Sequence, residues 1–467
     1  MDDAFSAGVL GKLPLGEACY TALRWALDEQ SLNNIFEEHR GSCYQGELSF
    51  STIVQLIADS LIQYEGSGRA SFEDAIDKGR LPTSVQAVYG KLSRIPVAVS
   101  EAFLAATSQR LRELVPENVE AFHLPACFDG WTVLGMDGKT VKRVPRLLKP
   151  LRKLKAGILG GKASVALDIR TKLVVSMKAD PDGYADELVL TKELQARVRE
   201  EHDSDDRPIL FVLDRLYCNR EIPSECLKGN GHFVIRFGGN MSFEADPTRK
   251  AKKSTTRDRA AVTEEWGWLG IDKTKPRVYV RRVSRECGTK TLRVVTDLID
   301  RKKYRAAAIL RVYLGRWNIE CVFQQITEVF SLEKLISTSS EGTIFQLAFC
   351  LLLYNTIQVV RAVIAQQQKR EVETISTEKL FESTRRQLIA VNELVPLSVL
   401  LQEIALNCSA ASVRRRLQKL LRNTWRNRWI KCPTRSRTDP MPKTSVRGNQ
   451  TTIFRELTKE KEARQRC

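Results

Sequence analysis

Histidines are few in this sequence, and the cysteines follow no metal-binding pattern. The four histidines, His39, His123, His202 and His232, are dispersed along the chain, and the 11 cysteines include no C-x-x-C pair. The sequence therefore lacks the H-E-x-x-H motif and the Cys/His spacing of zinc sites, and it indicates no disulfide framework. We expect reduced thiols, as in a cytosol.

Uninterrupted apolar runs are also missing. The first residues, MDDAFSAGVLGKLPLG, are acidic at their start and have no basic region before an apolar segment, unlike a secretory signal. The most apolar segment, residues 344–360, is interrupted by Gln346, Asn355 and Gln358. It falls short of the roughly 20 apolar residues that cross a bilayer. We predict a buried core helix there, no membrane partner and a cytoplasmic location.

Positive charge is in excess and unevenly distributed. The chain carries 74 Lys and Arg against 56 Asp and Glu, a net charge of +18. Residues 411–467 hold 17 Lys and Arg and 4 Asp and Glu, a net of +13, which leaves +5 for the first 410 residues. This balance favours a polyanionic partner, most often nucleic acid. The run VRRRLQKLLRNTWRNRW suits a basic helix on a DNA backbone, with a membrane-surface helix as the alternative.

The pattern of apolar residues changes near residue 130, from helical spacing to short β-rich runs. Residues 15–115 have apolar residues at helical spacing, with Ser caps and a break at Pro96, which predicts helices. Short β-rich runs follow, and one helical stretch separates the third run from the fourth, which predicts a mixed α/β sheet. Residues 238–292 are rich in Gly, Lys and Arg, and we interpret them as an inserted β-rich subdomain or a mobile loop. Beyond Pro433 we expect a loop-like segment, because few apolar side chains there could pack into a core.

Two aspartates end apolar strands. Asp137 follows the run VLGM and Asp214 follows PILFVL. Side chains at strand ends line the rim of a sheet, where ligands bind and carboxylates stay accessible to solvent. The alternative for each Asp is an ordinary turn or helix-cap residue.

A third acid lies in an expected amphipathic helix, YLGRWNIECVFQQITEVF, at residues 313–330. At about 100° per residue, Tyr313, Arg316 and Glu320 point within roughly 60° of one another. They form a candidate functional face, although an i,i+4 ion pair between Arg316 and Glu320 on a solvated face is the alternative.

Two strand-end aspartates and a helical glutamate are a ligand set for two Mg²⁺ or Mn²⁺ ions, which prefer carboxylate oxygens. Such a pair of ions, about 4 Å apart, supports phosphoryl transfer. Together with the basic tail, this chemistry points to a nucleic-acid phosphodiester.

These residues resemble a known family. The order Asp137, Asp214, Glu320, with the Glu in Y-x-x-R-W-x-I-E, is similar to bacterial DDE transposases of the insertion-sequence-four family, which carry a Y-R-E-K signature. The segments LSFSTIVQLI, YGKLSRIPVAVSEAFL, DPDGYADELVL and FVLDRLYCN also resemble parts of that family.

The resemblance implies an α/β fold with a ribonuclease H-like core. We expect a helical DNA-binding domain at 1–120 and the catalytic domain at 128–365, with a β-rich insertion at about 238–292. A helical, then basic and partly disordered region would follow at 366–467.

The resemblance also implies an activity, namely DNA cleavage and strand transfer at terminal inverted repeats, in a bacterial cytoplasm near the nucleoid. Two Mg²⁺ or Mn²⁺ ions would be held by the three acids, and a homodimer is expected in the DNA complex. The residues expected to contact DNA are Tyr313, Arg316, Arg215, Trp266 and Trp268. For the two tryptophans, the alternative is that they pack on a neighbouring sheet.

The sequence departs from the family pattern at one position. The pattern has a Lys seven residues after the Glu, where this chain has Thr327. Lys334 shares the helical face but lies about 10 Å further along the axis, so we do not expect it to substitute. Two alternatives follow: a degenerate transposase that only binds or nicks DNA, and a DNA-binding regulator whose acids are structural.

Overall fold

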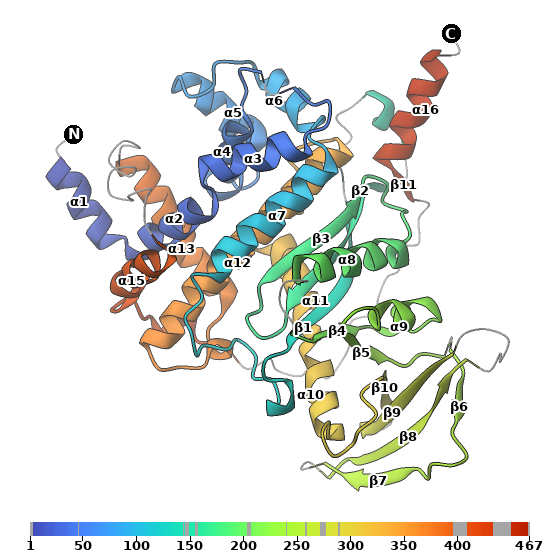
Figure 1. Ribbon diagram of the computed structural model, residues 1–467. Coiled ribbons are helices and arrows are strands. Elements are labelled where there is room, and N and C mark those ends of the chain that lie inside the picture. The colour runs from blue at the N-terminus through green and yellow to red at the C-terminus, as the bar shows by residue number, and fades with distance from the viewer. Residues whose placement is uncertain are drawn as a thin grey trace.

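A computed structural model gives the arrangement of the chain (Figure 1). The structure describes residues 3–44, 46–142, 144, 149–154, 157–202, 207–239, 241–256, 259–270, 277–287, 290–395, 409–432 and 450–465.

The N-terminal part is built of helices, as the helical spacing predicts. Ser side chains cap several of them; Ser49, for example, accepts from the Thr52 backbone N–H at 3.1 Å. Pro96 lies between the last two helices, where its ring is tolerated. The helices are α1 (Asp3–Lys12), α2 (Pro14–Ala26), α3 (Glu29–His39), α4 (Phe50–Ile62), α5 (Gly68–Asp77), α6 (Val85–Leu92) and α7 (Val97–Arg112).

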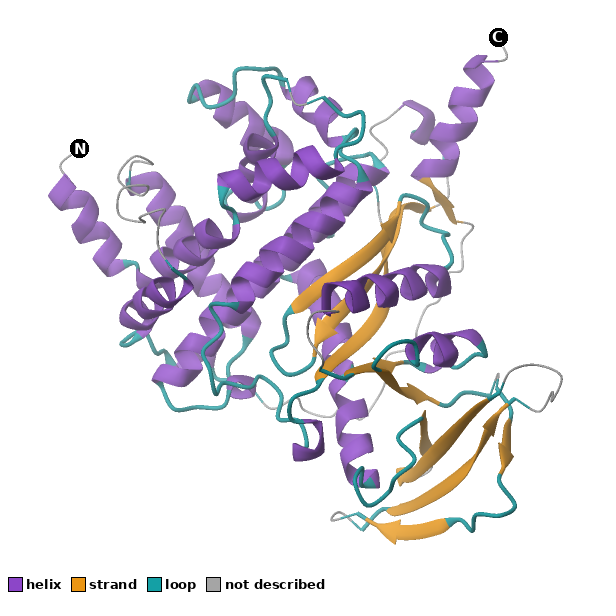
Figure 2. Cartoon of the chain, viewed as in Figure 1, coloured by secondary structure: helices purple, strands orange, loops and turns teal. Residues whose placement is uncertain are grey.

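The strands that follow form one mixed sheet, and the predicted α/β class is confirmed (Figure 2). Its first half contains β1 (Thr132–Lys142), β2 (Gly157–Asp168), β3 (Val174–Asp180), β4 (Ile209–Leu213) and β5 (Gly231–Arg236). β2 pairs antiparallel with β1 and β3, whereas β4 runs parallel to both β1 and β5.

Antiparallel strands extend this sheet beyond β5, in the order β5-β10-β9-β8-β6, with β7 beside β8. They are β6 (Phe243–Ala245), β7 (Lys252–Thr255), β8 (Ala261–Leu269), β9 (Val278–Cys287) and β10 (Lys290–Thr296). The segment at 238–292 is thus β-rich, as expected, although its last strand runs on to Thr296. Figure 1 shows these strands as a separate wing of the molecule.

Helices cover both faces of the first half of the sheet. α8 (Glu187–His202) and α9 (Glu221–Cys226) pack on the face that carries Leu134 and Met136. The opposite face contacts α10 (Ala306–Gly315), α11 (Trp317–Glu328) and α12 (Ser340–Gln367). Short 3-10 turns complete this region: η1 (Ala126–Phe128), η2 (Lys149–Leu151) and η3 (Arg215–Tyr217).

α12 is the predicted core helix. It is long and apolar enough to cross a membrane by length and composition, but its apolar window is entirely buried inside the protein. The polar residues that interrupt it are hydrogen bonded to neighbouring elements: Gln346 accepts from the Ile336 N–H at 2.8 Å, and Asn355 accepts from the Val174 N–H at 2.8 Å. These bonds satisfy polar groups that would otherwise be costly to bury.

One apolar core includes residues of the N-terminal helices, the sheet and α12. The division into domains at 1–120, 128–365 and 366–467 therefore stays a prediction.

The C-terminal part returns to the sheet. After α13 (Thr377–Leu394), α15 (Ala410–Leu421) packs on α2 and α12, with short turns η4 (Val372–Thr374) and η5 (Asn427–Trp429) nearby. The loop expected beyond Pro433 falls mostly on residues 433–449, which lie outside the described residues. Residues 450–465 differ from that expectation, because β11 (Gln450–Thr452) pairs parallel with β2 and α16 (Ile453–Gln465) follows it.

Candidate active site

Asp137 lies on β1 where the strand emerges from the core. Residues 132–136 are buried, and the carboxylate at 137 is partly exposed. Its Oδ1 accepts from the Gly138 N–H at 3.0 Å, and its Oδ2 lies 3.4 Å from Arg316 Nη1. Burial raises the pKa of Asp137 to about 6, Arg316 opposes this rise, and the nearby carboxylates of Glu187 and Glu320 add to it.

Asp214 occupies the matching place on the neighbouring strand. Gly135 on β1 pairs with Val212 on β4, and each Asp follows its paired residue by two positions. Asp214 Oδ1 accepts from the Tyr313 hydroxyl at 3.4 Å, and Arg236 Nη1 lies 3.8 Å away. The two aspartates therefore lie side by side where β4 ends. The expectation that Asp137 ends its strand is wrong, because β1 runs on to Lys142, whereas Asp214 does follow the last residue of β4.

The expected single helix at 313–330 is wrong in one respect, because the chain forms two helices, α10 and α11, that meet at Arg316. Gly315 precedes the junction, where a Cβ would lie 2.7 Å from Ile169. The carbonyl of Gly315 accepts from the Asn318 side-chain amide at 2.7 Å, which satisfies the group freed by the break. The break leaves Tyr313 and Glu320 on different helices.

Arg316 contacts two of the three acids. Its side chain is only 5 % exposed, and it contacts Asp137 from β1 as well as Glu320 from its own helix. Although burial lowers the pKa of Arg316, its hydrogen bond to Glu320 and the nearby Tyr313 and Asp214 raise that pKa above the usual value. The predicted ion pair of Arg316 with Glu320 is present, but it is buried on the arginine side and shared with Asp137.

The three acids offer the oxygen ligands that a hard divalent cation prefers. Asp137 in particular is a half-buried carboxylate with further carboxylates near it, an arrangement that a cation would stabilise. Within the described residues, however, no three His, Cys, Asp or Glu side chains are grouped closely enough to form a ready metal site. The Arg316 guanidinium lies between Asp137 and Glu320, so cation binding there requires it to move aside.

Glu187, the first residue of α8, is a fourth acid at this rim that the sequence did not single out. Its carboxylate lies against Gly138, where a Cβ would be 2.1–2.6 Å from the carboxyl atoms. It accepts from the Tyr217 hydroxyl at 2.9 Å. The sequence signal was the segment DPDGYADELVL, whose last acid begins a helix beside Gly138, the residue after Asp137.

Lys139 is a second residue that the sequence did not single out. Its ammonium donates to Thr327 Oγ1 at 2.9 Å and to the Phe323 carbonyl at 3.4 Å. Lys334, by contrast, lies 3.9 Å from Glu65, in the loop before α5, and so does not reach this face of α11.

The other residues expected to contact DNA, two in the β-rich wing and Arg215 after β4, differ in their exposure to solvent. Trp266 is 3 % exposed and donates to the Ile299 carbonyl at 3.0 Å, so its ring offers no free face to a base and the packing alternative holds. Trp268 is partly exposed and packs against Tyr279, with ring centroids 5.1 Å apart. Arg215 is exposed at the start of η3, directly beside Asp214.

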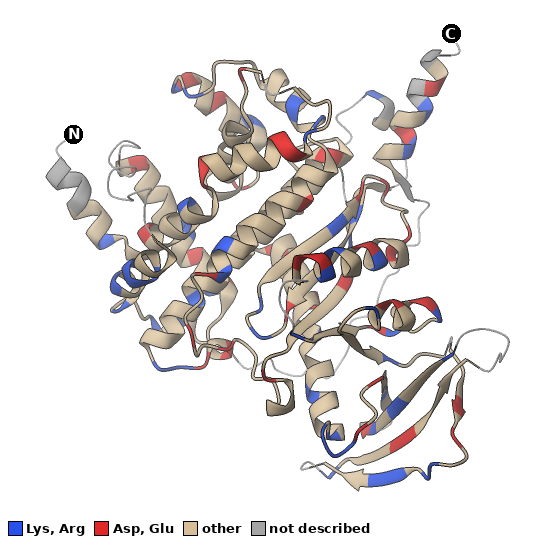
Figure 3. Ribbon diagram, viewed as in Figure 1, with Lys and Arg blue, Asp and Glu red and all other residues tan. Residues whose placement is uncertain are grey.

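The basic tail includes α15, and Figure 3 colours parts of this helix blue for Lys and Arg. Its apolar side packs inward through Val413, Leu417 and Leu421. Arg416 is paired with Glu17 at 2.8 Å and Arg414 with Glu117 at 3.0 Å. Part of this positive charge is therefore neutralised within the chain.

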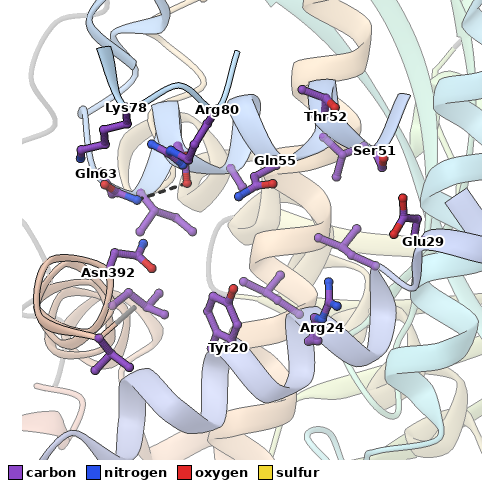
Figure 4. Close-up of a pocket in the computed structure, with 18 of the residues that line it drawn as sticks. Tyr20, Arg24, Glu29, Ser51, Thr52, Gln55, Gln63, Lys78, Arg80 and Asn392 are labelled. Carbon is purple, nitrogen blue, oxygen red and sulfur yellow. Dashed lines mark hydrogen bonds and ion pairs between the residues drawn. The ribbon is translucent and has the colours of Figure 1, made fainter. Parts of the chain in front are cut away.

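A cavity of about 730 Å³ opens between α2, α4 and α13 (Figure 4). Asp59 on its wall accepts from Arg80 at 2.9 Å and from Gln63 at 3.2 Å. Burial raises the pKa of Asp59, and Arg80 opposes the rise. Asp137, Asp214 and Glu320 do not line this cavity, so it is separate from the candidate active site.

Comparison with known proteins finds one family model that matches the central part of the chain. A search of curated proteins finds no match. A cryo-EM structure of the piggyBac transposase synaptic complex with hairpin DNA is similar at 10 % identity and a TM-score of 0.39, over 89 % of this chain and 87 % of that one. A TM-score this low does not establish a shared fold. Residues 132–356 match the family model described as the transposase DDE domain, and this span contains Asp137, Asp214 and Glu320, so the match supports a DDE transposase.

Proposed function

We propose that this chain is an insertion-sequence transposase that cleaves DNA at the terminal inverted repeats of its element and joins the ends to target DNA. The observation that carries the proposal is that neighbouring residues link the three acids: the Arg316 guanidinium contacts Asp137 and Glu320, and Tyr313, one turn earlier, donates to Asp214. A regulator without catalysis has no need for three carboxylates at one rim.

The proposal includes the finer assignment to the insertion-sequence-four family and a ribonuclease H-like core. Three antiparallel strands, then a helix and two strands parallel to the first, support that core. Tyr313, Arg316 and Glu320 match three positions of the Y-R-E-K signature. We further propose DNA binding by the N-terminal helices, a homodimer in the DNA complex and a cytoplasmic, nucleoid-associated location.

Asp137, Asp214 and Glu320 would hold two divalent ions, Mg²⁺ or Mn²⁺. When bound, such ions activate the attacking water or hydroxyl and stabilise the leaving oxygen. Tyr313 holds Asp214 in place by a hydrogen bond and Arg316 holds the other two acids. We therefore assign Arg316 first to positioning the carboxylates, because its buried guanidinium is committed to them in the structure.

DNA cleavage tests the proposal. A duplex copied from the DNA that flanks the gene is incubated with the protein and Mg²⁺, and strand breaks are mapped. Asp137→Ala, Asp214→Ala and Glu320→Ala should each abolish cleavage but keep DNA binding, because the acids hold metal and basic surfaces hold DNA. Glu328→Gln, which removes an exposed acid from the same helix, is the matched control and should cleave normally.

Three results would count against this function. Cleavage that persists in all three alanine variants would remove the acids from the chemistry. A parent protein that nicks DNA without joining ends would indicate the degenerate transposase. Binding with no cleavage under any divalent ion would favour the DNA-binding regulator.

A further inference from the structure

The ammonium of Lys139 lies beside Thr327, the position at which the family signature has a lysine. Its Nζ donates to Thr327 Oγ1 at 2.9 Å and to the Phe323 carbonyl at 3.4 Å, and it lies 5.6 Å from the centre of the Phe323 ring. A charge that is missing from the helix is thus supplied by the strand beside it.

The pairing follows from the geometry of β1 and α11. Asp137 and Lys139 are two residues apart on a strand, so both side chains point to the same face. Glu320 and Thr327 are seven residues apart, about two helical turns, and share one face of α11. The strand and the helix pack together. Asp137 therefore meets Glu320 through Arg316, and Lys139 meets Thr327 further along.

The ammonium keeps capacity for an anion. A lysine has three N–H donors, and the two acceptors of Lys139 in the described part of the chain are both neutral oxygens. The side chain is half-buried, so its remaining donor is not sealed off from solvent.

We propose that Lys139 binds a backbone phosphate of the DNA beside the three acids, and so supplies from β1 the positive charge that Thr327 lacks. The inference rests on the proposed transposase function. A second ammonium at position 327, as in Thr327→Lys, would lie beside the Lys139 ammonium and be repelled by it.

Exchanging the two residues tests this placement. Lys139→Thr, Thr327→Lys and the double variant Lys139→Thr/Thr327→Lys are compared with the parent for binding to the flanking duplex at several salt concentrations. The logarithm of the DNA-binding constant falls linearly with the logarithm of the salt concentration. Because Lys139→Thr loses one phosphate contact, this line should become less steep by about 0.9. The double variant should restore the slope, since it moves the cation to the helix.

Lys162→Thr is the matched control. Lys162 is also half-buried, donates to the Ala185 carbonyl at 2.9 Å, and pairs in register with Thr140, so it lies on the opposite face of the sheet. The salt dependence of DNA binding by Lys162→Thr should equal that of the parent. Melting temperatures of all variants identify any that fail to fold, and Lys139→Arg then serves as the charge-retaining substitute with an unchanged slope.

The result that would overturn the proposal is a Lys139→Thr protein with the parent slope and a lower melting temperature, since Lys139 would then only link β1 to α11. This failure differs from failure of the transposase function. In the first case the parent still cleaves and Asp137→Ala does not; in the second the parent does not cleave, whatever the slopes.

Discussion

Asp137 Oδ2 lies 3.4 Å from Arg316 Nη1, across a sequence separation of 179 residues. The same guanidinium contacts Glu320, so one cation of the protein balances two carboxylates that belong to different elements. Under the proposed function, Asp137 and Glu320 would hold a divalent ion, and this arginine would then compete with the ion for the same carboxylate oxygens.

Arg316→Gln should alter that competition. Without the guanidinium, Asp137 and Glu320 repel each other, and a divalent ion becomes the better partner. We expect Mg²⁺ to raise the melting temperature of the variant more than that of the parent, while cleavage becomes slower because the acids are poorly positioned. Arg311→Gln, on the exposed side of α10, is the control. Equal Mg²⁺-induced shifts in all three proteins would contradict the competition.

Asp137→Asn should change the pH dependence of stability in metal-free protein. The folded-state pKa of Asp137 is raised to about 6 from an ordinary value of 3.8, mainly by burial, so the folded protein favours the protonated form. The parent therefore loses stability relative to the Asn variant as pH rises from about 4 through about 6. Above pH 7 the variant should be more stable by on the order of 1 kcal/mol. Denaturant unfolding with chelator present measures this, and a pH-independent difference would count against it.

Gly138→Ala should damage the site without unfolding the chain. An added Cβ would lie 2.1–2.6 Å from the Glu187 carboxyl atoms, so that side chain must move away from the rim. We expect cleavage to fall while DNA binding is kept. Gly135→Ala is the control on the same strand, because its nearest contact, with Ile169, would be an ordinary 3.7 Å. If both variants cleave alike, the place of Glu187 beside Gly138 has no bearing on the reaction.

Alanine substitutions of the two tryptophans of β8 should have different effects, one on stability and the other on DNA binding. Trp266→Ala removes a buried ring and a hydrogen bond, and should cost about 3–5 kcal/mol of stability. Trp268→Ala removes a partly exposed ring and should mainly weaken DNA binding. Thermal unfolding and anisotropy titrations distinguish the effects; a Trp266→Ala protein of normal stability but weak DNA affinity would reverse the assignment.

Local patterns predicted much of the fold and of the candidate site. The apolar runs that end in Asp137 and Asp214 form neighbouring strands, because hydrophobic periodicity reports burial directly. The break at Gly315 was missed, since Arg316 keeps helical backbone angles and the periodicity continues through it. A glycine inside a helical pattern was the available signal.

Contacts between distant segments could not be predicted from local patterns. Lys139 reaches Thr327 across 188 residues, and Glu187 rests on Gly138 from the far side of the sheet. Both depend on how a helix and a strand cross, which periodicity does not encode. The return of β11 to the sheet was missed for the same reason, because QTT is too short to carry a strand pattern.

That returning strand has a consequence for synthesis of the protein. Residues 450–452 pair with residues 157–159 of β2, so this part of the sheet stays incomplete on the ribosome until almost all of the described chain has been translated. Segments generally fold as they emerge, and an uncovered strand edge invites pairing with another chain. A ribosome that stops early would therefore release a protein that has its three acids but an open sheet edge, ready to associate with a second nascent copy.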